Sequence, residues 1–277
     1  MADHLVDFRY AVLANFRENT RPMPWRETRD PYAILVSEFM LQQTQADRVL
    51  QKYPGFLTRF PDFEALASAP PADVIRAWQG LGYNRRALAL HRTAQAVVLH
   101  HGAVLPSDPQ VLLTFPGIGP YTAGAIAAFA FGVATPFIET NIRRVYIHWF
   151  FPDREDVHDA EILPLVEETL DTGDPRMWYY ALMDYGVMLK RTRGNANTRS
   201  AHYTKQSKFE GSDRQVRGAA LRVLGNRNKL TSPEIASALA DSEGLDVDLE
   251  RLSGILRNLR DEGFLRTSGD PERYDLA

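Results

Sequence analysis

Two glutamates next to apolar runs have the surroundings that acid–base chemistry requires. Glu38 directly precedes the apolar triplet 39–41, and Glu139 follows Phe137 and Ile138 just before a predicted helix. Burial of a carboxyl group disfavours its charged form and keeps a proton available near neutral pH. A second carboxylate can face a developing sugar cation, a pairing typical of glycosidic bond cleavage. The alternatives are a capping or salt-bridged surface glutamate at 38 and a simple helix cap at 139.

The segment 112–126 is an apolar run interrupted by Pro116-Gly117-Ile118-Gly119-Pro120. Pro116 is expected to end one helix, the two glycines to permit a hairpin with positive φ, and Pro120 to start a second helix. The first turn of that helix can seat a phosphate, which predicts backbone contacts at Gly117, Gly119 and Thr122. An ordinary helix–helix corner is the alternative. A monovalent cation is a further candidate ligand, on the carbonyl groups of Leu113, Phe115 and Ile118.

Four blocks occur in order along the chain: Trp25-Arg26, SEFMLQQT at 37–44, GLGYNRRA at 80–87 and PGIGPYTAGAIAAFAFG at 116–132. Together they resemble the helix-hairpin-helix superfamily of base-excision DNA glycosylases, across residues 20 to 190. Within it the sequence is most similar to adenine glycosylases that act on A paired with oxidised G. The resemblance implies double-stranded DNA with a mispaired or damaged base as partner, and release of a flipped base.

The resemblance also implies roles for three catalytic residues. Glu38 stands where the family's acid stands and would protonate a purine at N7. Glu139 replaces the superfamily's aspartate, and its extra methylene moves the carboxylate by about 1.5 Å. Tyr121 stands where bifunctional members carry a Schiff-base lysine, so strand cutting is not expected. The Tyr121 hydroxyl is expected to bond Glu139 or the sugar phosphate.

Further positions match family residues that handle the flipped base and the duplex. Gln43 and Tyr83 match side chains that enter the duplex. Trp25, Arg26 and Asp184 match the lining of the adenine pocket. Arg143, early in the helix after Glu139, is expected to contact the DNA backbone.

Although the net charge is −3, one segment of the chain is strongly basic. Residues 190–229 hold eleven Lys and Arg against Glu210 and Asp213, a local balance of +9 that leaves −12 for the rest. Such a basic face can steer a polyanion. The residues expected to contact phosphates are Arg191, Arg193, Lys205 and Lys208. A solvated surface or an ordered linker is the alternative.

The sequence contains no cysteine. Most of the resembled enzymes bind an iron–sulfur cluster through four cysteines, the first of which would fall near Lys190. No cofactor is therefore expected, and 190–211 is interpreted as a loop that takes the place of the cluster. The N-terminus lacks a signal peptide, and no apolar run is long enough to span a membrane, so we expect a cytoplasmic protein with no membrane partner. We also expect a monomer.

Periodicity predicts an all-α, two-lobed core over residues 1–211 and a small α+β domain over 212–277. The expected core helices are 5–19, 31–53, 63–69, 72–79, 85–101, 109–114, 121–131, 140–150, 160–170 and 176–189. Turns are expected at Pro54-Gly55 and other Pro/Gly positions. Helices at 212–224, 231–239 and 248–262 and a strand-turn-strand around 268–271 resemble a winged helix, either for DNA contact or for docking.

Two alternatives for the function stay open. The resembled adenine glycosylases carry a large C-terminal domain that recognises oxidised guanine, and residues 212–277 do not resemble it. The chain is therefore either an adenine glycosylase or a glycosylase for another lesion, such as T or U opposite G or a damaged purine. A non-catalytic DNA-binding protein, inactivated at Glu139, is the alternative from another class.

Overall fold

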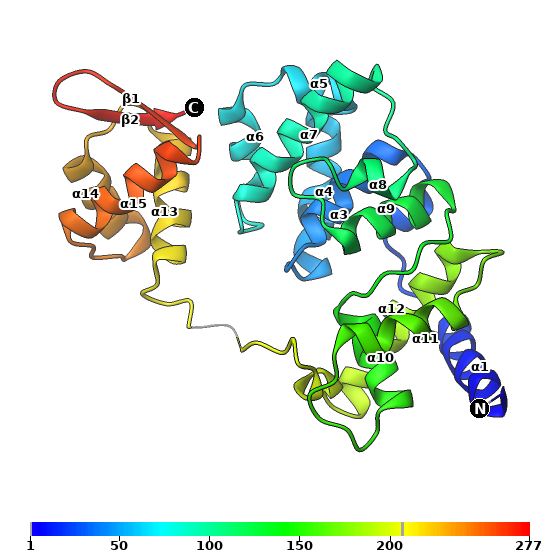
Figure 1. Ribbon diagram of the computed structural model, residues 1–277. Coiled ribbons are helices and arrows are strands. Elements are labelled where there is room, and N and C mark those ends of the chain that lie inside the picture. Colours follow the sequence, from blue (N-terminus) through cyan, green and yellow to red (C-terminus); the bar gives the residue numbers. More distant parts are fainter. Residues whose placement is uncertain (1, 206–207) are drawn as a thin grey trace. The chain divides into compact units, whose positions relative to one another are not determined.

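A computed structural model describes residues 2–205 and 208–277 of the chain. The chain divides into two compact units. The first unit consists of Met1–Glu38 and Leu105–Lys205, and the second consists of Phe39–Val104 and Gln206–Ala277. The described residues fold into helices, apart from one two-stranded antiparallel hairpin near the C-terminus (Figure 1). No helix within this part of the chain is long and apolar enough to cross a membrane.

The first unit is built around aromatic side chains contributed by helices far apart in sequence. Phe8, Tyr146 and Trp178 are fully buried. The Phe8 ring lies tilted to that of Tyr146, with 5.4 Å between centroids, and edge-on to that of Trp178. Its elements are α1 (Ala2–Asn19), α2 (Pro24–Glu27), most of α3 (Pro31–Leu41), α8 (Pro109–Leu112), α9 (Pro120–Phe131), α10 (Thr140–Phe150), α11 (Asp159–Thr169), α12 (Pro175–Thr192) and the 3₁₀ turn η1 (Ala196–Arg199).

Helices α10 and α12 approach each other closely at Gly186. A Cβ built on Gly186 would lie 2.5 Å from the carbonyl oxygen of Asn141, so only glycine fits this crossing. The Gly186 carbonyl in turn accepts a hydrogen bond from Arg144 Nη1 at 3.0 Å. The start of α10, which follows Glu139, is thereby fixed against α12.

The second unit joins two segments that are distant in sequence. Arg76 Nε donates to the Gly225 carbonyl at 3.0 Å and Gln79 Nε2 to the Leu221 carbonyl at 3.2 Å, while Ile75 shares one apolar cluster with the C-terminal helices. Its elements are α4 (Ala46–Arg59), α5 (Phe63–Ser68), α6 (Pro71–Trp78), α7 (Arg85–His101), α13 (Asp213–Asn226), α14 (Ser232–Glu243), α15 (Leu249–Asp261), β1 (Leu265–Ser268) and β2 (Arg273–Leu276).

The predicted all-α core and the order of three helices and a hairpin at the C-terminus are confirmed. Strands β1 and β2 pair from Leu265 with Leu276 to Ser268 with Arg273. The division at residue 211 stays a prediction.

Three local predictions are wrong. The stretch 31–53 is two helices, because Gln43 adopts a left-handed backbone with φ of 52° between them. Pro54 lies inside α4, which continues past the expected turn because buried Tyr53 and Phe56 hold it to the core. Helix α8 ends at Leu112, four residues before Pro116.

Candidate active site

A carboxyl group and a phenol meet where α3 and the first turn of α9 come together. Glu38 is 3 % exposed, and its Oε2 accepts a hydrogen bond of 2.9 Å from the Tyr121 hydroxyl. The Tyr121 ring packs against Phe137 at 5.8 Å between centroids. The Tyr121 hydroxyl was expected to bond Glu139 or the sugar phosphate, and its partner is instead Glu38.

Burial raises the pKa of Glu38 from 4.5 to about 7. The nearby negative charge of Glu139 raises this pKa further, whereas the Tyr121 hydrogen bond and the Arg26 charge lower it. The increase that the sequence predicts from burial is confirmed. Glu38 therefore holds its proton over much of the neutral pH range and can still release it.

Glu139 caps the N-terminus of α10. Its Oε1 accepts the backbone N–H groups of Asn141 at 2.6 Å and Ile142 at 2.9 Å, and Oε2 accepts Asn141 Nδ2 at 3.2 Å. Burial raises its pKa, against the lowering effect of the Ile142 and Asn141 N–H groups and of Arg144. The predicted helix cap at Glu139 is thus confirmed, and the cap fixes the direction of this carboxylate.

Asp184 is held by two arginines rather than facing open space. Its side chain is 1 % exposed, Arg26 donates to both oxygens at 2.7 and 2.9 Å, and Arg21 Nε donates at 2.6 Å. Burial opposes ionisation, but these hydrogen bonds and charges outweigh it and lower the pKa of Asp184. Arg21 carries no signal in the sequence, because only the folded chain brings it to Asp184.

Arg26 also lies over the Tyr180 ring, 4.5 Å from its centroid, and its buried Nε has no hydrogen-bond partner among the described residues. Trp25 is 4 % exposed. A cavity of about 600 Å³ borders Arg26, Tyr180 and Arg176 and contains neither Glu38 nor Glu139 in its lining. Trp25, Arg26 and Asp184 as base-pocket residues stay a prediction.

Gln43 and Tyr83 belong to the second unit, where each lies at a loop with positive φ. Gln43 has φ of 52° and Tyr83 of 44°, values that non-glycine residues rarely adopt. Both side chains are exposed. Their exposure leaves them available to enter a duplex, which stays a prediction.

The hairpin before α9 differs from its prediction in one detail. Gly117 has the expected positive φ of 77°, whereas Gly119 is an extended N-cap residue with φ of −96°. The Phe115 carbonyl accepts the N–H of Ile118 at 3.2 Å. In the described part of the chain no three His, Asp or Glu side chains form a metal-binding group. The carbonyl cation site and the phosphate contacts at Gly117, Gly119 and Thr122 stay predictions.

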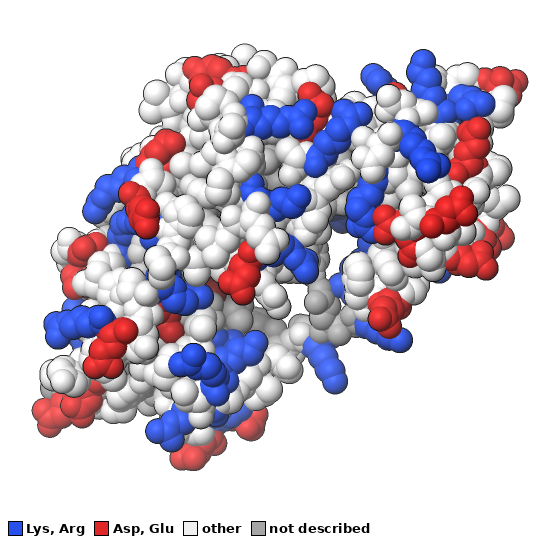
Figure 2. Space-filling model, turned by 180° about the vertical axis from the view of Figure 1, so that it is seen from behind, with Lys and Arg blue, Asp and Glu red and all other residues white. Residues whose placement is uncertain are grey.

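Acidic side chains from inside and outside the basic segment 190–229 neutralise part of its charge. The pairs are Lys208 with Glu210 at 3.3 Å, Arg217 with Glu262 at 2.6 Å and Arg222 with Glu243 at 2.6 Å. Figure 2 shows acidic side chains lying among basic ones on one face of the molecule. Arg143 is likewise engaged, by Asp159 through two hydrogen bonds of 2.6 Å. Arg191 and Lys205 are exposed and remain the better candidates for phosphate contacts.

The segment after α12 is held by polar contacts. Asn197 Nδ2 donates to the Thr140 carbonyl at 2.8 Å, and Arg199 Nη1 donates to the carbonyls of Phe151 and Pro152 beyond the end of α10. A chain of 277 residues without cysteine cannot supply the thiolates of a cysteine-bound cluster.

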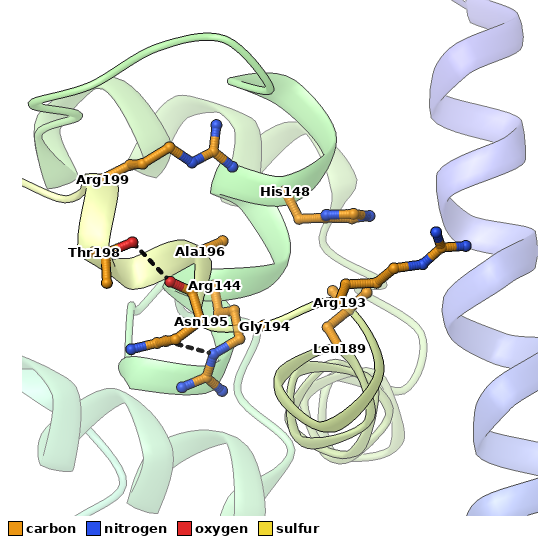
Figure 3. Close-up of a pocket in the computed structure, with 9 residues that line it drawn as sticks. All are labelled: Arg144, His148, Leu189, Arg193, Gly194, Asn195, Ala196, Thr198 and Arg199. Atoms are coloured by element: carbon orange, nitrogen blue, oxygen red, sulfur yellow. Dashed lines mark hydrogen bonds between the residues drawn. The ribbon is translucent and has the colours of Figure 1, made fainter.

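A second cavity, of about 290 Å³, lies between this segment and α10. It is lined by Arg144, His148, Arg193 and Arg199 together with uncharged residues (Figure 3). In Figure 3 the Arg193 and Arg144 side chains extend in different directions. No carboxylate lines this cavity.

Residues 36–166 match the family model described as HhH-GPD superfamily base excision DNA repair protein. The chain is 49% identical over 237 residues to the adenine DNA glycosylase of Mycobacterium tuberculosis, covering 77% of each protein. It is 38% identical over 231 residues to the adenine DNA glycosylase of Mycolicibacterium smegmatis, covering 77% of this chain and 78% of that one. A solved thermostable thymine-DNA glycosylase matches with a TM-score of 0.64 and 28% identity, over 70% of this chain and 91% of that one.

The chain therefore belongs to the HhH-GPD superfamily of base excision DNA repair proteins, and its macromolecular partner is DNA. The resemblance predicted from the four sequence blocks is confirmed. The relatives identify the family, and the catalytic roles of Glu38, Tyr121 and Glu139 stay predictions.

The raised pKa of Glu38 predicts a pH-dependent effect on stability. A carboxyl group whose folded pKa is about 7, against 4.5 unfolded, binds more protons in the folded state between these values, so stability falls as pH rises through this window. Glu38→Gln removes this titration. Urea unfolding should show the variant gaining about 2–3 kcal/mol relative to wild type between pH 5 and pH 8. An equal stability difference at both pH values would contradict the assignment of that pKa to Glu38.

Proposed function

We propose that the protein is a monofunctional DNA glycosylase that hydrolyses the N-glycosidic bond of a flipped adenine mispaired with G or 8-oxoguanine. The observation that carries the proposal is the buried Glu38 carboxyl, with its pKa raised to about 7, hydrogen-bonded to Tyr121. Such a group is a proton donor suited to neutral pH. The names of the relatives from the two mycobacteria support adenine as the base.

In this mechanism Glu38 gives its proton to N7 of the adenine, which makes the base a better leaving group. The bond between the base and the sugar C1′ breaks, and the bonding electrons leave with the base. The Glu139 carboxylate, fixed by the N–H groups of α10, faces the cationic sugar. Water then adds to C1′ and its proton passes to the ionised Glu38, so the acid is restored and the products are free adenine and an abasic strand.

Glu38→Gln is the test of this proposal. The substitution keeps the shape of the side chain and removes the transferable proton, so base release should be abolished while duplex affinity stays nearly unchanged. Single-turnover release of adenine and gel-shift affinity measure the two effects. In wild type the rate should fall about tenfold per pH unit above pH 7, as Glu38 ionises. More than a tenth of the wild-type rate in the variant would overturn the role of Glu38.

Glu139→Gln should keep the helix cap, because its amide oxygen still accepts N–H groups, while removing the charge that faces the sugar cation. We expect base release to slow by about a thousandfold. Glu139→Asp is the matched variant, since it keeps the charge and shortens the side chain by one methylene. Full activity of Glu139→Asp would show that the pocket is not shaped to the longer side chain.

Tyr121 leaves no amine at the position of a Schiff-base lysine, so the abasic strand should remain intact. Borohydride added during turnover should trap no covalent protein–DNA adduct. Denaturing gels of the labelled strand, run with and without alkali, check both statements. A trapped adduct would require another amine, with Lys190 the first to be replaced.

The basic segment is proposed to contact DNA phosphates through Arg191, Arg193, Lys205 and Lys208. Because Lys208 is paired with Glu210, the sharper test replaces Arg191 and Lys205 with alanine. The slope of log affinity against log salt should fall by about 0.9 for each contact removed. Lesion-containing and undamaged duplexes should weaken alike, because phosphate contacts do not read bases. An unchanged slope would leave the segment with a structural role alone.

A second candidate function is removal of T or U opposite G. The similarity to the solved thymine-DNA glycosylase favours it, since 28% of aligned residues are identical. A panel of duplexes with A, T, U, hypoxanthine or alkylated purines opposite G, 8-oxoguanine or C separates the candidates by the base released. Binding without release from any duplex would favour the non-catalytic alternative.

We further propose that residues 1–211 form the glycosylase core and 212–277 a winged-helix-like domain, in a cytoplasmic monomer. The three helices and the hairpin after residue 211 support this division.

A further inference from the structure

A single buried guanidinium connects three segments of the second unit. Arg86, the second residue of α7, is 8 % exposed. Its Nη1 donates to the carbonyls of Phe39 at 2.8 Å and Met40 at 2.9 Å, and also to that of Gln42. These acceptors belong to the last turn of α3 and to the loop that follows it.

The other side of the same guanidinium reaches the loop that carries Tyr83. Arg86 Nη2 donates to the carbonyls of Gly82 at 2.9 Å and Leu81 at 3.3 Å, and Nε donates to the Tyr83 carbonyl at 3.3 Å. Nη2 also donates to the Thr44 hydroxyl at 3.0 Å. The Thr44 hydroxyl in turn lies 3.3 Å from the Leu81 carbonyl, so the two loops are joined directly as well.

The Arg86 contacts surround two of the non-glycine residues that have left-handed backbone. Gln43 lies between Gln42 and Thr44, and Tyr83 follows Gly82. Left-handed backbone at a non-glycine residue costs about 1–2 kcal/mol and persists only where its surroundings enforce it. Arg86 also lies 5.5 Å from the centroid of the Tyr83 ring and 5.3 Å from that of Trp78. Although burial lowers its pKa to about 10, the guanidinium stays charged at neutral pH.

We infer that Arg86 is a positioning residue that clamps the Gln43 loop to the Tyr83 loop, so that both exposed side chains meet the duplex as one rigid pair during base extrusion. The inference rests on the proposed function. Arg86 also holds carbonyls at the C-terminus of α3, the helix in which Glu38 directly precedes Phe39.

The test compares Arg86→Lys with Arg85→Ala. Lysine keeps the charge but has one nitrogen in place of the planar fork, and it cannot bridge carbonyls on both loops. Arg85 is the adjacent arginine, is exposed, and pairs with Glu262 rather than with either loop. Thr44→Val removes one hydroxyl from the clamp and is the milder variant if Arg86→Lys folds poorly.

Base extrusion is measured by the fluorescence of 2-aminopurine in place of the target adenine, beside single-turnover release and duplex affinity. Arg86→Lys should lower extrusion and release together by about 10–100-fold, with duplex affinity within about threefold of wild type. Thr44→Val should lower extrusion and release by a smaller factor than Arg86→Lys does. Arg85→Ala should match wild type in both. Wild-type extrusion in a folded Arg86→Lys, or an equal defect in Arg85→Ala, would overturn the inference.

Hydrogen exchange separates failure of this inference from failure of the proposed function. Amides of 41–45 and 80–84 should exchange at least about tenfold faster in Arg86→Lys, whether or not any duplex loses a base. Glu38→Gln should leave this exchange and the 2-aminopurine signal unchanged. Unchanged exchange in Arg86→Lys would show that Arg86 does not hold the loops.

Discussion

The structure depends on keeping one carboxylic acid buried and protonated. Glu38 would lose its proton in water at neutral pH, and burial within α3 moves its pKa to about 7. The Tyr121 hydrogen bond keeps the carboxyl from being a buried polar group without a partner, an arrangement that would itself destabilise the fold. The charge of Glu139 disfavours a second negative charge nearby and so raises the pKa of Glu38 further.

The helix cap accounts for a glutamate at position 139. A capping carboxylate is fixed by the N–H groups that it accepts, and Glu139 reaches those of Asn141 and Ile142 across its longer side chain. The close approach of α12 at Gly186 fixes where α10 begins. The site is therefore set by where a helix starts, and a longer side chain is accommodated by the backbone that it caps.

Periodicity and end signals predicted nearly every helix, because amphipathic patterns, prolines and glycines act locally. The break in 31–53 was not predictable this way, since a left-handed Gln43 is enforced by Arg86, 43 residues further along. The candidate site also contains features that local sequence predicts and contacts that it does not predict. Burial of Glu38 followed from its apolar neighbours, whereas the bonds from Tyr121 to Glu38 and from Arg21 to Asp184 join residues that only the fold brings together.

Helix ends also explain how the chain is held together after α12 without cysteines. Glu139 lies at the N-terminus of α10, and Arg199 lies at its C-terminus. An acidic group near the N-terminus and a basic group near the C-terminus interact favourably with the helix dipole. Arg144 in the same helix holds Asn195, and Asn197 returns to the Thr140 carbonyl. Neutral and charge-assisted hydrogen bonds thus fix the chain after α12 against the helix that Glu139 caps. The proposed catalytic carboxylate and this segment are therefore parts of one polar network.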